Sequence, residues 1–339
     1  MLAFSAFKPP MSDLKPIGSG LTRPECVLTH RSGFLFCSDW QGRGGVAVVS
    51  PRGEVRRVSI AGTGSDLRPN GIALEPGGSF LLAHLGATDG GVFRLFPDGS
   101  IEPVLTDIDG AAIPPSNFPL RDRQGRLWLT VSTRIAPRAD DYRPSAASGF
   151  IAVSDANGAR VVADGLGYAN EIAFSADERH LFVNETFARR LTRFDVRPDG
   201  GLGGATLIWQ FGPGDYPDGL VLDEDGGLWV TSIVSNRVIR VAPDGSTAER
   251  VLEDADPGHL ALAEAAYASS RMGRSHLDQQ PAPVLRNISS LAFGGSDLRT
   301  AYLGCLLGDQ IFSFTTSHRG LRPLHYDFDI SPLLQALDF

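Results

Sequence analysis

The chain has 339 residues, a formal net charge of −8 and 42% hydrophobic residues. An acidic chain with scattered arginines does not suit a polyanion, so we do not expect nucleic acid as a partner. No run approaches the roughly 18 apolar residues of a membrane span, and Met1 to Ser19 lacks the apolar stretch of a signal peptide. We therefore expect no membrane partner and a cytoplasmic location.

A strand–turn–strand pattern recurs along the chain. Each copy has a short strand with alternating apolar residues, a turn containing Gly or Asp, and a second β-rich strand; the clearest copy runs from Tyr216 to Thr231. The copies begin, in chain order, at Glu25, Asn70, Asn117, Asn170, Asp218 and Ser289. They are roughly 45–53 residues apart, with a longer interval before the last, and this period is typical of β-propeller blades. The sequence predicts an all-β, six-bladed β-propeller that forms one domain over residues 1–339.

Pro-Asp-Gly tripeptides occur in two different places in this pattern. Those at Asp98, Asp199 and Asp244 lie within predicted outer hairpins, where Pro fixes one backbone angle and Gly accepts a positive φ, so we interpret these three as turn residues. The tripeptide at Asp218 instead begins an inner hairpin. Position in the blade therefore separates Asp218 from the other three.

The segment 253–285 lacks strand character and predicts a helical insertion between blades five and six. Asp256 is the expected N-cap and Pro257 the first helical residue, followed by helix-forming residues up to Met272 and a terminal Gly273. Such an insertion either packs on the outside of the propeller or forms a lid over one mouth. We favour the lid, because long insertions in compact domains are often functional.

The chain contains three cysteines, Cys26, Cys37 and Cys305, without metal-ligand spacing. We expect all three to be buried as small hydrophobic side chains.

The first residue of every copy carries a polar side chain. Equivalent residues of successive blades are related by rotation about the axis, so these six side chains are expected to form a ring at one mouth of the channel. Asn and Asp before Gly are also common turn residues, but the same polar position in all six copies favours a shared role. Carboxylate and amide oxygens converging on one point are the ligands that a hard divalent cation requires.

These features resemble the senescence marker protein/gluconolactonase family, also called regucalcin-like. The resemblance rests on the Pro-Asp218-Gly hairpin, on the Asn170 copy that ends in Asn184-Glu185-Thr186, and on Glu25 near the N-terminus. It runs from about Leu21 to Phe314 and shades into strictosidine-synthase-like propellers. It implies a single divalent cation at the axis, held by a Glu, two Asn and an Asp.

Carried over residue by residue, the resemblance implies Glu25, Asn117, Asn170 and Asp218 as metal ligands. Two positions depart from the family pattern, because Phe118-Pro119 follows Asn117 and Cys26 follows Glu25 where the family has Gly-containing sequences. Ca²⁺ is the first choice of cation, with Mg²⁺, Mn²⁺ and Zn²⁺ as alternatives. For substrate binding we also select three residues, which are Asn70, His84 and Glu185.

The expected activity is the hydrolysis of a lactone, such as a sugar-acid lactone or a related cyclic ester, so the expected partner is a small-molecule substrate. Asp218 is the first candidate for the base that activates water and Glu25 is the second. The chain has no Gly-x-Ser-x-Gly elbow and no dinucleotide or Walker pattern, which favours metal chemistry over a covalent or nucleotide mechanism. Two alternatives remain open, namely a non-hydrolytic metal-dependent enzyme (a lyase, or C–C bond cleavage through an enolate) and a binding module without catalysis. We expect a monomer or a small homo-oligomer.

Overall fold

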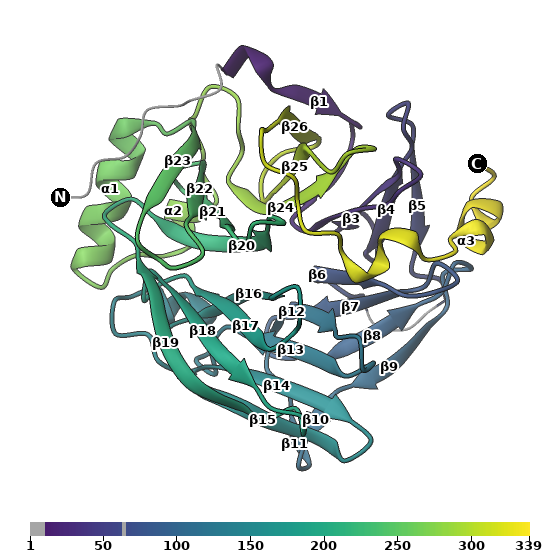
Figure 1. Ribbon diagram of the computed structural model, residues 1–339, viewed down its shortest axis with the longest axis horizontal. Coiled ribbons are helices and arrows are strands. Elements are labelled where there is room, and N and C mark those ends of the chain that lie inside the picture. The colour runs from purple at the N-terminus through teal and green to yellow at the C-terminus, as the bar shows by residue number, and fades with distance from the viewer. Residues whose placement is uncertain (1–10, 63–65) are drawn as a thin grey trace.

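The structure is a six-bladed β-propeller, as predicted. The computed structural model describes residues 11–62 and 66–339, and within them six four-stranded antiparallel sheets surround a central axis (Figure 1). Residues 1–10, which include part of the segment considered as a leader, lie outside the described residues. Within the described part of the chain, no helix is long and apolar enough to cross a membrane.

Each blade takes consecutive strands from the axis outward, except the last. Blades one to three contain β2 (Val27–Thr29), β3 (Leu35–Asp39), β4 (Gly45–Val49) and β5 (Val55–Ser59); β6 (Pro69–Leu74), β7 (Phe80–His84), β8 (Val92–Leu95) and β9 (Ile101–Leu105); and β12 (Ser116–Arg121), β13 (Leu127–Val131), β14 (Gly149–Asp155) and β15 (Gly158–Leu166). Blades four and five contain β16 (Ala169–Phe174), β17 (His180–Glu185), β18 (Arg190–Val196) and β19 (Leu202–Gln210); and β20 (Tyr216–Leu222), β21 (Leu228–Ile233), β22 (Arg237–Val241) and β23 (Ala248–Glu253). A short ribbon of β10 (Asp107–Ile108) and β11 (Ala111–Ala112) links blades two and three.

The sixth blade joins the two ends of the chain. Its three inner strands are β24 (Ile288–Gly294), β25 (Thr300–Cys305) and β26 (Ile311–Thr315), and its outer strand is β1 (Lys15–Ile17) from the N-terminal region. The strands β1 and β26 pair antiparallel, with Pro16 opposite Phe312, and Figure 1 shows them side by side. The pairing closes the ring of blades, because it joins the N-terminal strand to the last sheet. Repeat analysis did not predict β1, because a three-residue strand has too little periodicity to detect.

The inner strands carry an irregularity at the position of the predicted ring. Five of the six lose register with their neighbour there, between Pro69 and Ile72, Ser116 and Phe118, Ala169 and Ile172, Pro217 and Leu220, and Ile288 and Ser290. Bulges of this kind bend a strand and re-aim a side chain, and they are common beside active sites. The bulges therefore explain how the ring residues turn toward the axis.

Glycines let neighbouring inner strands approach closely at the same level. A Cβ atom on Gly219 would lie 2.5 Å from the Cα atom of Ser290, and one on Gly71 would lie 2.8 Å from the Cα atom of Phe118. No side chain fits at such distances. The residue after the ring position is therefore glycine where two inner strands converge most tightly.

The predicted helical insertion is present between blades five and six. The helix α1 (Pro257–Ala268) begins after Asp256, whose side chain accepts a hydrogen bond from the backbone N–H of His259 at 2.7 Å. The helix ends at Ala268 instead of continuing to Met272, and Ser270 in the following turn has a φ of 55°. A second short helix, α2 (Arg274–Leu277), then starts after Gly273.

The remaining helical elements are short. They are η1 (Met11–Asp13), η2 (Arg138–Asp141), η3 (Leu324–Asp327) and α3 (Ser331–Ala336). The C-terminal segment, yellow in Figure 1, leaves blade six and crosses one face of the propeller toward β5, where α3 lies. The three cysteines are free and buried, as predicted.

Candidate active site

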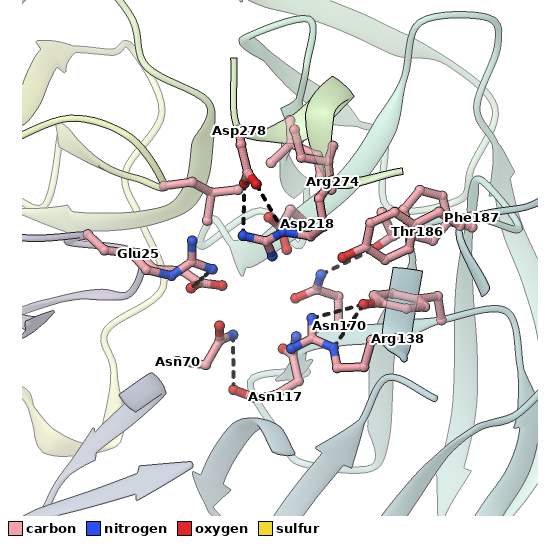
Figure 2. Close-up of a pocket in the computed structure, with 16 residues that line it drawn as sticks. Glu25, Asn70, Asn117, Arg138, Asn170, Thr186, Phe187, Asp218, Arg274 and Asp278 are labelled. Carbon is pink, nitrogen blue, oxygen red and sulfur yellow. Dashed lines mark hydrogen bonds and ion pairs between the residues drawn. The ribbon is translucent and has the colours of Figure 1, made fainter. Parts of the chain in front are cut away.

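Five of the six ring residues meet in one pocket at the axis. Figure 2 shows Glu25, Asn70, Asn117, Asn170 and Asp218 converging there from the starts of five inner strands. All five residues are buried, with at most 6% of their surface exposed. Rotation of a single position from blade to blade thus gathers carboxylate and amide groups that are far apart in the sequence.

Neighbouring hydroxyl and backbone groups fix the orientation of the amides. The Asn170 Nδ2 donates to Thr186 Oγ1 at 3.1 Å, and the Thr186 hydroxyl donates to the Pro217 carbonyl at 2.8 Å. Since its nitrogen is engaged by Thr186, Asn170 is oriented with its oxygen available to the pocket. The Asn117 Oδ1 is buried and has no hydrogen-bond partner among the described residues.

The two carboxylates lie in an environment that disfavours their charge. Burial raises the pKa of Asp218 well above its ordinary value, and the negative charge of Glu25 raises it further, while Arg23 opposes the shift. The Glu25 Oε2 lies 2.7 Å from Arg23 Nη2, although it is not aligned for a hydrogen bond. Arg23 and Arg138 thus offset only part of the effect that burial and the charge of Glu25 have on the pKa of Asp218.

The residues of this pocket fit a hard divalent cation. The pocket offers an amide oxygen without a partner on Asn117, a second amide whose nitrogen donates to Thr186, and two carboxylates that repel each other. Oxygen atoms of these groups are the ligands that such an ion prefers. No group of three or more His, Cys, Asp or Glu side chains within the described ranges could hold a metal. A cation here would therefore depend on amide oxygens together with Glu25 and Asp218.

Three arginines also line the pocket, and their partners differ. Arg23 pairs with Glu25, and Arg274 in α2 pairs with Asp278, with Nη2 2.8 Å from Oδ1 and Nε 3.1 Å from Oδ2. Arg138 instead contacts the hydroxyl of Tyr168, through Nε at 3.2 Å and Nη2 at 2.9 Å. Figure 2 shows the Arg138 guanidinium group extending toward the amide side of the pocket.

An aromatic wall, formed by Tyr142, Tyr168 and Phe187, lines the pocket beside Arg138. The rings of Tyr142 and Phe187 stack with centroids 4.6 Å apart, and Tyr168 packs edge-on against Phe187 at 4.8 Å. Tyr168 has a φ of 72°, in the left-handed region that bulky residues rarely adopt. Strained residues of this kind persist where surrounding structure holds them in place, and they cluster at functional sites.

The insertion contributes to the pocket and is tied to the propeller. Arg274, Leu277 and Asp278 form part of the wall. In α1, Glu264 accepts hydrogen bonds from the Tyr216 hydroxyl at 2.7 Å and from the backbone N–H of Gly214 at 2.9 Å, which connects this helix to the strand that carries Asp218.

The volume of the pocket is about 40 Å³, enough for a few water molecules and well below the roughly 300–1,000 Å³ of sites for drug-sized ligands. Entry of a lactone therefore requires part of the wall to move. That need agrees with the predicted lid, which stays a prediction.

Three ring or mouth residues predicted from sequence lie elsewhere. Ser289 donates its hydroxyl to the Glu25 carbonyl at 2.8 Å and is absent from the described pocket wall. His84 accepts a hydrogen bond from the backbone N–H of Arg68 at 3.0 Å through Nδ1, and Glu185 accepts one from the backbone N–H of Gly167 at 2.6 Å. Neither His84 nor Glu185 belongs to the described residues that line the pocket.

The pairing of the strands explains why His84 and Glu185 do not line the pocket. His84 lies opposite Pro69 and Glu185 opposite Ala169, each one residue before a ring position. Successive side chains of a strand point to opposite faces, so these two lie on the face that turns away from the ring residues. We therefore no longer assign them to substrate binding, whereas Asn70 lines the pocket.

Sequence reasoning missed the cationic and aromatic parts of the wall. Arg138 and Tyr142 lie in the long connection between β13 and β14, which has no counterpart in the other blades and so gave no repeat signal. Arg23 lies two residues before Glu25, outside the ring positions that the repeat predicted. Phe187, which directly follows the Asn184-Glu185-Thr186 segment, also lines the pocket.

A family model described as the SMP-30/gluconolactonase/LRE-like region matches residues 23–256. The chain belongs to this family. One relative is a lactonase, drp35, of Staphylococcus saprophyticus, with 28% identity over 57% of this chain and 59% of that protein. Another is a 6-deoxy-6-sulfogluconolactonase of Pseudomonas putida, with 27% identity over 68% of this chain and 67% of that protein. The match thus spans between about half and two thirds of the length of these relatives.

Solved structures show the same fold. A gluconolactonase from Xanthomonas campestris has a TM-score of 0.61 at 20% identity, over 89% of this chain and 87% of that one. A calcium-binding protein, regucalcin, from Agrobacterium tumefaciens has a TM-score of 0.61 at 17% identity, over 92% and 95%. A virginiamycin B lyase from Staphylococcus aureus has a TM-score of 0.57 at 14% identity, over 89% and 99%. At these identities the likeness concerns the fold, which serves more than one chemistry.

Proposed function

We propose that this protein is a lactonase that opens the ring of a lactone with a divalent cation held by Glu25, Asn117, Asn170 and Asp218. The observation that carries the proposal is the convergence of two buried carboxylates and of amides with an unused oxygen, at the axis of a propeller whose relatives include lactonases. Ca²⁺ is our first choice, supported by the oxygen-only ligands and by the calcium-binding neighbour.

When bound, the cation supplies positive charge that polarises the lactone carbonyl and stabilises the negative charge that develops on its oxygen. Asp218 takes a proton from the attacking water, whose oxygen forms the new bond to the carbonyl carbon. The ring C–O bond then breaks, and Asp218 returns the proton to the departing ring oxygen, which yields a hydroxy acid. Glu25 is the second candidate for this proton transfer.

The residues around the ring support this chemistry by positioning. Thr186 holds the Asn170 amide with its oxygen free, and Arg23 holds the Glu25 carboxylate. Among possible substrates, a sugar-acid lactone is our first choice, and the partner that we propose is this small molecule. The P. putida relative is named for a sulfonated sugar lactone.

Metal content and lactone hydrolysis should be measured on the wild type and on the Asp218→Ala and Asn170→Ala variants. About one cation per chain is expected in the wild type, with loss of the cation in both variants and a drop in turnover of roughly 10³-fold or more in Asp218→Ala. The mass of the product should exceed that of the lactone by one water, which separates hydrolysis from a lyase reaction.

Asp244→Ala is the matched control, because it removes an aspartate from the same Pro-Asp-Gly tripeptide at an exposed turn. It should keep both the cation and the activity. Full lactonase activity in Asp218→Ala would refute the proposal. A wild type that binds no cation after incubation with Ca²⁺, Mg²⁺, Mn²⁺ or Zn²⁺ would favour the binding module.

A further inference from the structure

The pocket contains one arginine that lacks an acidic partner. Arg23 and Arg274 each pair with a carboxylate that also lines the pocket. Arg138 forms no ion pair with any described residue, and its hydrogen bonds go to the neutral hydroxyl of Tyr168. Glu25 and Asp218 act on Arg138 only at longer range than an ion pair. The guanidinium group is therefore left without a direct acidic contact, which an anionic group of a ligand can supply.

The balance of charges in the pocket points the same way. Its described walls contain three arginines (Arg23, Arg138 and Arg274) and three carboxylates (Glu25, Asp218 and Asp278). These charges cancel, so the proposed divalent cation would leave the pocket with an excess of two positive charges. A neutral lactone would leave that excess uncompensated, whereas an anionic one would reduce it.

The geometry around Arg138 suits a planar or tetrahedral anion. Two of its nitrogens are held by the Tyr168 hydroxyl, and the structure gives Nη1 no partner among the described residues. Tyr168 is itself fixed by Phe187 and by its left-handed backbone, so the guanidinium group is anchored before a ligand arrives. A preorganised arginine binds a carboxylate or sulfonate through charge-assisted hydrogen bonds.

We propose that Arg138 binds an anionic substituent of the substrate, and that this protein acts on lactones that carry a carboxylate, sulfonate or similar group away from the ring carbonyl. The aromatic wall of Tyr142, Tyr168 and Phe187 lies beside Arg138 and offers an apolar surface to the carbon skeleton of the ring. The substrate class rests on the proposed lactonase function, whereas binding of the anion by Arg138 is separable from it.

Two lactones that differ in one group test the substrate class. D-glucono-1,4-lactone ends in a CH₂OH group, whereas D-glucaro-1,4-lactone carries a carboxylate at that carbon. We expect wild-type kcat/KM to be at least 10-fold higher for the charged lactone. Arg138→Gln should lower it by roughly 10- to 100-fold for the charged lactone and by less than about 3-fold for the neutral one. Arg138→Lys, which keeps the charge but loses the planar fork, should fall between.

Arg134→Gln is the matched control, because Arg134 lies four residues earlier, is exposed and pairs with Asp164 outside the pocket. It should leave both substrates unaffected. An equal loss for the two lactones in Arg138→Gln, or a wild type that prefers the neutral lactone, would overturn the substrate class.

A binding measurement separates the role of Arg138 from turnover. Calorimetric titration of chelator-treated protein with D-glucarate and D-gluconate, the ring-opened products, should give at least 10-fold tighter binding of D-glucarate by the wild type, and Arg138→Gln should lose this preference. Equal affinity of wild type and Arg138→Gln for D-glucarate would refute anion binding by Arg138. Failure to hydrolyse either lactone, with Arg138-dependent binding of D-glucarate intact, would instead overturn the lactonase function and leave the anion site standing.

Discussion

The two ends of strand β20 hold buried aspartates in opposite situations. Asp218, near its start, lies in the axial pocket with its charge disfavoured by burial and by Glu25. Asp223, just after its end, accepts hydrogen bonds from Trp229 Nε1 at 2.9 Å, from the backbone N–H of Gly227 at 2.7 Å and from Arg240 Nε at 2.7 Å. Hydrogen-bond donors of the fold satisfy the carboxylate of Asp223, whereas burial and Glu25 disfavour the charge of Asp218.

Blade three repeats the satisfied arrangement. Asp122 accepts hydrogen bonds from Trp128 Nε1 at 2.8 Å and from the Nε of Arg126 at 2.5 Å. These side chains belong to the end of the inner strands that faces the second mouth of the channel. There the walls enclose a cavity of about 460 Å³, lined mainly by apolar side chains of the inner strands and by the C-terminal segment from Leu321 to Phe328.

The two arrangements differ in how completely their polar groups are hydrogen-bonded. Buried charges with complete hydrogen bonding hold the inner hairpins together, whereas the ring leaves oxygens without partners at a cost in stability.

The largest effect is expected from Asp223→Ala. The substitution leaves the Trp229 N–H and the Arg240 guanidinium without their acceptor, so the free energy of unfolding should fall by on the order of 3–5 kcal/mol. Urea unfolding followed by tryptophan fluorescence measures the loss, and Asp225→Ala in the same turn, where the aspartate is exposed, is the control. The folded fraction should still bind the cation. A loss below about 1 kcal/mol would show that the two ends of β20 do not differ in the way proposed.

We expect acid to lower the stability of the protein through His325, which lines the cavity at the second mouth. Burial, together with the neighbouring His30, lowers the pKa of this residue to about 4. Because the unfolded value is about 6.5, the unfolded chain takes up the proton first, and stability falls as the pH drops from about 6.5 to 4. The loss is at most about 3 kcal/mol.

Unfolding curves between pH 7 and pH 4.5 for the wild type and His325→Gln measure how the free energy of unfolding depends on pH. The slope should be shallower in the variant. Parallel slopes would mean that His325 is not held neutral by its surroundings. His180, which is more exposed and lies 3.1 Å from Asp195, is the site for a control substitution.

The repeat in the sequence predicted the fold and most of the ring because both depend on equivalent positions in successive blades. The same logic separated Asp218 from the aspartates of the outer hairpins, and the structure agrees. Asp98, Asp199 and Asp244 are exposed, and each accepts a hydrogen bond from a backbone N–H two residues later. The prediction of Asp256 as an N-cap depended only on neighbouring residues in the sequence, and it is confirmed.

The repeat could not predict features that do not occupy equivalent positions in successive blades. Strand β1 is defined by its pairing with β26, which closes the ring, and not by a hydrophobic pattern in its own sequence. The orientation of His84 and Glu185 depends on bulges in the neighbouring inner strands, and a pattern of hydrophobicity does not reveal a bulge. Arg138 and Arg274 come from segments that occur once, so the specificity of the pocket is encoded in the least repetitive parts of the chain.

The smallest effect, and the most direct comparison of function with stability, is expected from Asp218→Asn. In cation-free protein the pKa of Asp218 is raised above its unfolded value of about 3.9. At neutral pH the unfolded chain ionises this group more easily than the folded protein does, so the carboxylate lowers stability progressively as the pH rises above 3.9. Removing the charge should therefore stabilise the chelator-treated protein at pH 7 by on the order of 1 kcal/mol, and the gain should vanish below about pH 3.9.

Saturating Ca²⁺ should reverse the order of the two proteins, because the proposed cation stabilises the wild type by mass action and the variant lacks a ligand. Thermal unfolding with chelator and with Ca²⁺, at pH 7 and at pH 3.5, gives all four comparisons, with Asp244→Asn as the exposed control from the same tripeptide. A variant less stable than the wild type in chelator at pH 7 would mean that Asp218 already has sufficient partners. In that case the two ends of β20 would be alike, and the ring would not need a cation to satisfy its oxygens.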